Sequence, residues 1–178
     1  MRWLSPDECP GLYLGHREIV GRPVLIPLGS FENRPWGPMV LDTLLALAIA
    51  CRASRVCGCA ILWSIGYGYS PVHRLWLGPG PDELRLVLRR IAEQVVERLR
   101  SREAVVLDGH YGHRDVAAGT AKALGLGYLN VWDVVIELGY RELEQQDRAR
   151  EADRRAPHGY EERRRDGACE RGVRVEAL

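Results

Sequence analysis

The hydrophobic and polar positions of this chain form a regular succession of short apolar runs and longer helical periods. Apolar runs predict strands from Val24 to Leu28, Cys59 to Ile65, Ala104 to Leu107 and Tyr128 to Trp132. Helices are predicted from Leu41 to about Ser54, from Pro81 to Leu99, and from about Arg114 to Leu124. Each strand is followed by a loop and a helix, which is typical of an α/β fold with a mostly parallel sheet and helices on both faces.

The domain organisation follows from length and from a change of pattern near the end. The chain has 178 residues, of which 46% are hydrophobic, so one domain with a substantial core is expected. After Val134 a helical segment runs to about Arg155 and becomes charged on all faces. We therefore predict one domain over residues 1–155 and an irregular, Arg-rich tail over residues 156–178.

Charge and cysteine content restrict the classes of partner. A net charge of +1 gives no electrostatic reason to expect nucleic acid as the main partner. No leader segment begins the chain, and the longest apolar run, Leu41 to Cys51, is too short to cross a membrane. The five cysteines are scattered, and Cys57-Gly58-Cys59 leads into an apolar run, so we expect buried, reduced side chains and a cytoplasmic protein.

Two carboxylates follow the first strand. Glu32 lies in the Pro/Gly-rich loop after Leu28, and Asp42 lies on the first turn of the next helix. Side chains at these two places converge at the edge of an open sheet, where they can share a cation. The simpler interpretation is that Glu32 is a solvated loop residue and that Asp42 interacts with the helix dipole.

Further polar residues follow the other strands. The loop from Gly66 to Pro81 contains four glycines and three prolines, and loops of this length are usually functional. It carries His73, which is either an exposed loop histidine or part of a site. The third and fourth strands lead to His110 and Asp133, so Glu32, His73, His110 and Asp133 are expected to share one rim.

Several short motifs resemble, in order and spacing, those of the creatininase (creatinine amidohydrolase) family. They are Gly29-Ser30-Phe31-Glu32, then Asp42, Gly68-Tyr69-Ser70 with His73 and Gly78, Asp108-Gly109-His110-Tyr111, and Tyr128 to Val134. The resemblance covers about Pro23 to Val134. It implies a three-layer α/β/α sandwich and a dinuclear metal site that activates water to hydrolyse a cyclic amide or a formamide.

The family's metal ligands map only partly onto this chain. The resemblance assigns the first metal to Glu32, Asp42 and His110, whereas the second-metal positions read Arg34, Asp42 and Gly112. A guanidinium cannot ligate a cation, so we expect one divalent ion per chain, Zn, Fe or Mn. Arg34 would instead neutralise Asp42 or bind a substrate carboxylate or phosphate, and His113 is an alternative ligand because it lies three residues after His110.

The remaining site residues are also expectations from the resemblance. Tyr69, Ser70, Tyr111 and Trp132 are expected to contact substrate, and Arg34 and His73 to act in catalysis. The stretch Pro157 to Glu162 is a candidate remnant of a terminal family motif. His158 is then either the proton donor to the leaving nitrogen or a tail histidine.

Two functions therefore remain open. One is a metal-dependent amidohydrolase of a small-molecule substrate, for which formylaminopyrimidine deformylation in riboflavin and deazaflavin biosynthesis is the nearest analogy in the family. The other is a non-catalytic relative that binds a ligand or serves as an assembly subunit. The helix from Leu41 has apolar residues on nearly every face, so we expect it to be buried within the domain or against a neighbouring subunit. This helix and the family's habit of forming rings favour a homo-oligomer.

Overall fold

The fold is built on a parallel four-stranded sheet in a computed structural model, which describes residues 4–33, 38–71, 74–137, 139, 141–142 and 145. Its strands are β1 (Val24–Leu28), β2 (Ala60–Ile61), β3 (Ala104–Asp108) and β4 (Gly127–Asn130). They lie in the order β2-β1-β3-β4, and every neighbouring pair is parallel. The register pairs Leu28 with Asp108 and Asp108 with Asn130, so the carboxyl ends of three strands meet at one edge.

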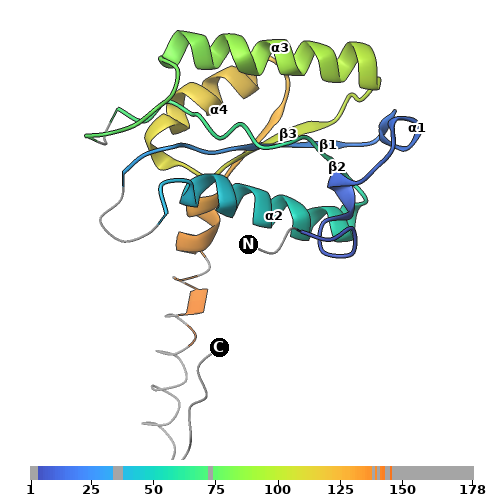
Figure 1. The fold of residues 1–178 in the computed structure, drawn as a ribbon, viewed down its shortest axis with the longest axis horizontal. Coiled ribbons are helices and arrows are strands. Elements are labelled where there is room, and N and C mark those ends of the chain that lie inside the picture. The colour runs from blue at the N-terminus through green and yellow to red at the C-terminus, as the bar shows by residue number, and fades with distance from the viewer. Residues whose placement is uncertain are drawn as a thin grey trace, which may run out of the picture. The chain divides into compact units, whose positions relative to one another are not determined.

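Helices cover both faces of this sheet, which confirms the predicted three-layer α/β/α architecture. Figure 1 shows α2 (Leu41–Cys57) on one face, and α3 (Pro81–Leu99) with α4 (Arg114–Ala123) on the other. Side chains of β1 alternate between the two layers. Ile26 and Leu28 pack in the core with Leu84 and Leu88 of α3, whereas Leu25 packs in a second core with Leu47 of α2.

The second strand is shorter than predicted. The sequence predicts a strand from Cys59 to Ile65, but β2 ends at Ile61, and only an isolated bridge joins Ile65 to Leu28. The carbonyl of Pro27 accepts a hydrogen bond from Ile65 N, so this side of Pro27 faces β2. Because proline has no N–H to donate there, the ladder is interrupted at this point.

The fourth strand also ends early. It is predicted to run to Trp132, but residues 131–137 are helical and β4 ends at Asn130. The side-chain oxygen of Asn130 accepts the N–H of Trp132 at 3.0 Å, which is the geometry of a helix N-cap. An apolar sequence after the strand thus enters a helix because the residue before it caps the first turn.

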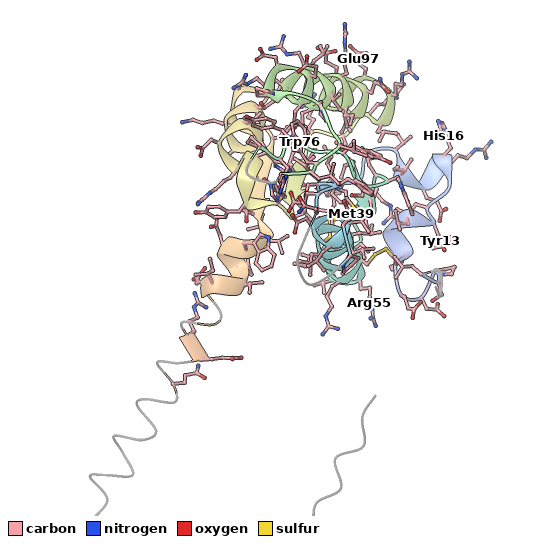
Figure 2. The ribbon with its side chains drawn as sticks, turned by 60° about the vertical axis from the view of Figure 1, so that its left-hand side comes forward. Tyr13, His16, Met39, Arg55, Trp76 and Glu97 are labelled. Atoms are coloured by element: carbon pink, nitrogen blue, oxygen red, sulfur yellow. A yellow bond between two sulfur atoms is a disulfide. The ribbon has the colours of Figure 1, made fainter. Side chains whose placement is uncertain are left out.

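The N-terminal segment contains η1 (Pro10–Leu12) and α1 (His16–Ile19), and it is tied to α2 by a disulfide between Cys9 and Cys51. Figure 2 draws a disulfide bond in yellow beside α2. A second disulfide joins Cys57 and Cys59. The expectation of reduced cysteines is therefore wrong for both pairs, because the sequence does not reveal that Cys9 returns to α2. The Cys9–Cys51 bond spans 42 residues and contributes about 2–4 kcal/mol to stability.

Helix α2 is buried on one face rather than all round. Asp42, Ala46, Ala50 and Ser54 share the buried face, while Leu44 and Val56 are exposed to 38% and 90%. The exposed face of one chain does not test the predicted homo-oligomer, which stays a prediction.

The chain divides into a compact unit over Met1–Tyr140 and a second unit over Arg141–Leu178. In the second unit the structure describes only residues 141, 142 and 145, so the predicted tail over residues 156–178 lies outside the described part. Among the described residues, no helix combines the length and apolar character that membrane crossing requires.

Replacing Leu84 tests which face of α3 supports the core. Leu84 is fully buried, so Leu84→Ala should lower the free energy of unfolding by about 2–5 kcal/mol through lost contacts and a residual cavity. The matched control is Leu86→Ala on the exposed face of the same helix, which should cost less than about 0.5 kcal/mol. Urea midpoints measure both variants, and equal losses would show that α3 is packed differently.

Candidate metal centre

Three ionisable side chains meet in the interior at the carboxyl edge of the sheet. Glu32 follows β1, Asp42 lies on the first turn of α2, and His110 follows β3. Glu32 and Asp42 are fully buried, and His110 is 4% exposed. One ligand atom from each lies within 4.8 Å of the others. The structure thus brings together the three residues that the resemblance assigns to one metal.

The imidazole of His110 lies between the two carboxylates. Its Nδ1 is 2.7 Å from Asp42 Oδ2 and 3.4 Å from Glu32 Oε2. Two carboxylates buried side by side are costly unless positive charge compensates them. Carboxylate oxygens and an imidazole nitrogen are ligands that Zn²⁺, Mn²⁺ and Fe²⁺ accept. The chemistry and spacing of the donor set therefore fit a divalent cation.

Two serines hold the carboxylates in place. Ser30 Oγ donates to Asp42 Oδ2 at 3.0 Å, and Ser70 Oγ donates to Glu32 Oε2. Both serines are fully buried. Ser70 therefore orients Glu32, and its predicted contact with substrate stays a prediction. Ser30 orients Asp42 in the same way. In the sequence, only the position of Ser30 within the Gly29–Glu32 motif indicates this role.

A short ladder brings the loop of Ser70 beside Glu32. Asn33 N donates to Leu75 O at 2.8 Å, and Leu77 N donates to Phe31 O at 2.9 Å. An isolated antiparallel bridge pairs Glu32 with Trp76 between them. The backbone of the long loop is thus fixed to the segment that carries the first carboxylate.

A third buried carboxylate, that of Asp108, fixes the backbone of His110. Asp108 Oδ1 accepts the backbone N–H of His110 at 2.9 Å, and Oδ2 accepts the hydroxyl of Tyr128 at 2.7 Å. Asn130 Nδ2 donates to the carbonyl of His110 at 3.3 Å. Burial and the neighbouring charge of Asp108 raise the pKa of Tyr128 well above its ordinary value. Asp108, Tyr128 and Asn130 lie within the family-like motifs, but the sequence alone does not predict their contacts with one another and with His110.

His113 lies next to this group and is not part of the three-residue cluster. Its Nδ1 is 3.2 Å from Asp108 Oδ1, and its ring contacts His110 with 4.9 Å between centroids. Its side chain is fully buried, and neither ring nitrogen has a hydrogen-bond partner among the described residues. A ligand role for His113 stays a prediction.

Comparison with known proteins places the chain in a family. The family description "Creatininase: Creatinine amidohydrolase" matches residues 17–163, which is most of the chain. The chain belongs to the creatininase family. No curated protein sequence matches it.

Solved creatininase structures share the fold at low sequence identity. A crystal structure of creatinine amidohydrolase (creatininase) is 20% identical, with a TM-score of 0.55 over 66% of this chain and 54% of that chain. A structure described as creatininase Mn is 19% identical, with a TM-score of 0.54 over 66% of this chain and 55% of that chain. A mutant creatininase complexed with creatine is 18% identical, with a TM-score of 0.55 over 66% of this chain and 54% of that chain. The chain thus spans about half the length of these creatininases.

Gly112 distinguishes this creatininase-family site. A Cβ at this position would lie 2.3 Å from His110 Nε2, closer than any real contact. The resemblance assigns this position to a glutamate ligand of a second metal. Here the imidazole of His110 occupies the space that a side chain at position 112 would need, and the number of metal ions per chain stays a prediction.

The other predicted residues are dispersed around the centre. Tyr111 is 54% exposed beside His110, whereas Tyr69 makes an edge contact with Trp76 at 5.7 Å between centroids. Trp132 Nε1 donates to Gly109 O at 2.7 Å and so stabilises the loop before His110. Asp133, expected on the rim, forms an ion pair with Arg114 at 2.9 Å. Arg34, His73 and His158 lie outside the described residues.

Gly112→Ala should weaken metal binding by about 10-fold or more, because the added Cβ displaces the imidazole of His110. The matched control is Gly119→Ala on α4, where an added Cβ meets no atom within 4 Å. Competition with a chromogenic chelator measures Zn²⁺ affinity in both variants. Unchanged affinity in Gly112→Ala would mean that His110 does not bind the ion in this orientation.

Tyr128 should make stability depend on alkaline pH. Its raised pKa means that the folded protein keeps this proton at a pH where the unfolded chain releases it, so the free energy of unfolding falls as pH rises above about 10. Tyr128→Phe should flatten this fall between about pH 9.5 and 11. Urea unfolding midpoints across this pH range measure the fall in stability, and Tyr67→Phe at an exposed position is the control. A slope unchanged in Tyr128→Phe would contradict the assignment.

Proposed function

We propose that this protein is a metal-dependent amidohydrolase that cleaves a C–N bond in a small formamide or cyclic amide. The observation that carries the proposal is the convergence of Glu32, Asp42 and His110, all buried, within 4.8 Å at the carboxyl edge of a parallel sheet. Ligand sites of open α/β sheets lie at this edge. The creatininase family, to which the chain belongs, is described by an amidohydrolase activity.

The three residues would hold one Zn, Fe or Mn ion per chain. When bound, such an ion lowers the pKa of a water molecule towards neutrality and polarises an amide carbonyl. Ser30 and Ser70 keep the carboxylates oriented, so that the site needs little rearrangement. Asp108 fixes the backbone of His110 and thereby the position of its ring. The neighbours' own descriptions name Mn in one creatininase and a Zn–Zn type in another.

The substrate side of the proposal rests on fewer residues. Tyr111 is the exposed aromatic side chain next to His110, and it is a candidate contact for a planar substrate. We assign Arg34 to binding a substrate carboxylate or phosphate, His73 to the substrate side, and His158 to proton donation to the leaving nitrogen. Binding of a substrate phosphate by Arg34 would suit a formylaminopyrimidine nucleotide, so deformylation in riboflavin and deazaflavin biosynthesis is the first activity to assay. We also propose that the protein acts as a homo-oligomer in the cytoplasm, although the disulfides Cys9–Cys51 and Cys57–Cys59 remove the argument for this location from reduced cysteines.

A second candidate function is ligand binding without hydrolysis. Gly112 and Arg34 occupy positions at which the family motif has ligands of a second metal. These two departures favour a relative that keeps the fold and has lost the chemistry.

Metal content separates the two candidates. Protein purified without added metal or chelator should contain about one Zn, Fe or Mn per chain by elemental analysis, and His110→Ala should lose it because one ligand is removed. The matched control is His16→Ala, an exposed histidine of α1 that points away from the fold in Figure 2. Retention of the metal by His110→Ala would contradict the assigned site.

Hydrolysis is then assayed on a panel of formamides and cyclic amides with wild type, His110→Ala and chelator-treated wild type. The amidohydrolase proposal expects activity in wild type alone, with recovery after the metal is returned to the chelated protein. A metal-loaded protein inactive on the whole panel would favour the ligand-binding candidate. No stoichiometric metal after incubation with Zn²⁺, Fe²⁺ and Mn²⁺ would overturn the hydrolase.

A further inference from the structure

The end of α2 carries a second chemically active group, the Cys57-Gly58-Cys59 turn. Helix α2 ends at Cys57, and Gly58 adopts the left-handed conformation with a φ of 65°. The N–H of Gly58 donates to the carbonyl of Ser54 at 2.9 Å, which closes the helix. This turn folds the chain back so that the sulfurs of Cys57 and Cys59 form a disulfide.

This disulfide contributes little to the stability of the fold. A disulfide stabilises mainly by restricting the unfolded chain, and the restriction grows with the length of the closed loop. Cys57 and Cys59 are two residues apart, whereas Cys9 and Cys51 are 42 residues apart. The Cys9–Cys51 bond thus has a structural role that the Cys57–Cys59 bond does not share.

The two sulfurs of the short disulfide differ in accessibility. Cys57 is exposed, while Cys59 is buried with 6% exposure in the core beneath α2. Cys9 and Cys51 are 0% and 4% exposed. An attacking thiolate must reach a disulfide sulfur, so Cys57 is the one cysteine of these four that a dissolved thiol reaches.

One backbone donor contacts the sulfur of Cys57, and two arginines belong to the surroundings of this turn. The backbone N–H of Cys59 donates to Cys57 Sγ at 3.2 Å. Arg22 Nη1 donates to the carbonyl of Gly58 at 2.9 Å, so a guanidinium lies against the turn. Arg55 in the last turn of α2, labelled in Figure 2, adds a second positive charge. These groups offset the partial negative charge of the helix C-terminus.

We propose that Cys57-Gly58-Cys59 is a thiol–disulfide exchange site that a dithiol opens at Cys57. A thiolate of the dithiol attacks Cys57 Sγ, the Cys57–Cys59 bond breaks, and its electron pair passes to Cys59 Sγ, which takes up a proton. The second thiol of the reductant then attacks the mixed disulfide and releases Cys57, leaving the reductant as a cyclic disulfide. Two electrons and two protons pass from the dithiol to the protein, and the reverse reaction closes the bond again.

This site is independent of the metal centre. Asp42 lies at the first turn of α2 and Cys57 at its last residue, and a helix of 17 residues is about 25 Å long. Substitutions at Cys57 and Cys59 therefore leave the residues of the proposed hydrolase untouched. Failure of one proposal does not decide the other.

The reactivity of single cysteines tests the asymmetry. Cys59→Ser leaves Cys57 as a thiol and Cys57→Ser leaves Cys59, and both are made with Cys169→Ser to remove the fifth cysteine. Dithiodipyridine should react with the Cys59→Ser protein at least about 10-fold faster, because its thiol is the exposed one. Equal rates, or a faster reaction of Cys57→Ser, would overturn the proposal.

The second measurement uses the wild-type chain and needs no variant to fold. The protein is treated with increasing dithiothreitol under native conditions, alkylated, and analysed by peptide mass mapping. Cys57 and Cys59 should become alkylated at a lower dithiothreitol concentration than Cys9 and Cys51, and should be protected again after oxidised dithiothreitol is added. Alkylation of Cys57 and Cys59 without reductant, simultaneous opening of both disulfides, or failure to re-form the short one would each overturn the proposal.

Discussion

The arrangement of this protein depends on accommodating buried carboxylates at the end of a parallel sheet. Glu32, Asp42 and Asp108 have no solvent exposure, and an unpaired charge in such surroundings is strongly unfavourable. The chain offsets this cost with polar groups that contact the carboxylates: two serine hydroxyls, the hydroxyl of Tyr128, and the backbone N–H and imidazole of His110. Few of these partners tolerate replacement by an apolar side chain, because each would leave a carboxylate without its donor.

The sheet register provides the geometry for that arrangement. β1 and β3 pair residue for residue from Val24 with Ala104 to Leu28 with Asp108, so the loops after both strands leave the sheet at the same level. Helix α2 then returns across one face and presents Asp42 where these loops meet. Gly109 allows this close approach, because a Cβ there would lie 2.1 Å from the carbonyl of Asp42. The cluster of Glu32, Asp42 and His110 therefore forms where the loops after β1 and β3 meet the first turn of α2.

Much of this arrangement can be predicted from sequence. Alternation of apolar runs and amphipathic helices predicts the strand-helix order, and the parallel sheet follows because each crossover contains a helix. Glu32 and Asp42 can be proposed as a cation-binding pair because one follows a strand and the other begins a helix, whereas the choice of His110 over His73 and Asp133 comes from the resemblance to the family. The early ends of β2 and β4 depend on which way Pro27 faces and on the side chain of Asn130 capping a helix. The roles of Ser70 and His113, and the pairing of Cys9 with Cys51, depend on tertiary contacts between distant segments, which periodicity does not encode.

The contact between His110 and Asp42 joins residues that are 68 positions apart, and it exists only when α2, β1 and β3 are already in place. A cation that binds these side chains therefore recognises the native state and has no comparable site on the unfolded chain. By mass action, such an ion at 100 times its dissociation constant raises the free energy of unfolding by about 2.7 kcal/mol. Occupation of the candidate metal centre would thereby link the supply of a trace element to the equilibrium stability of the whole folded domain.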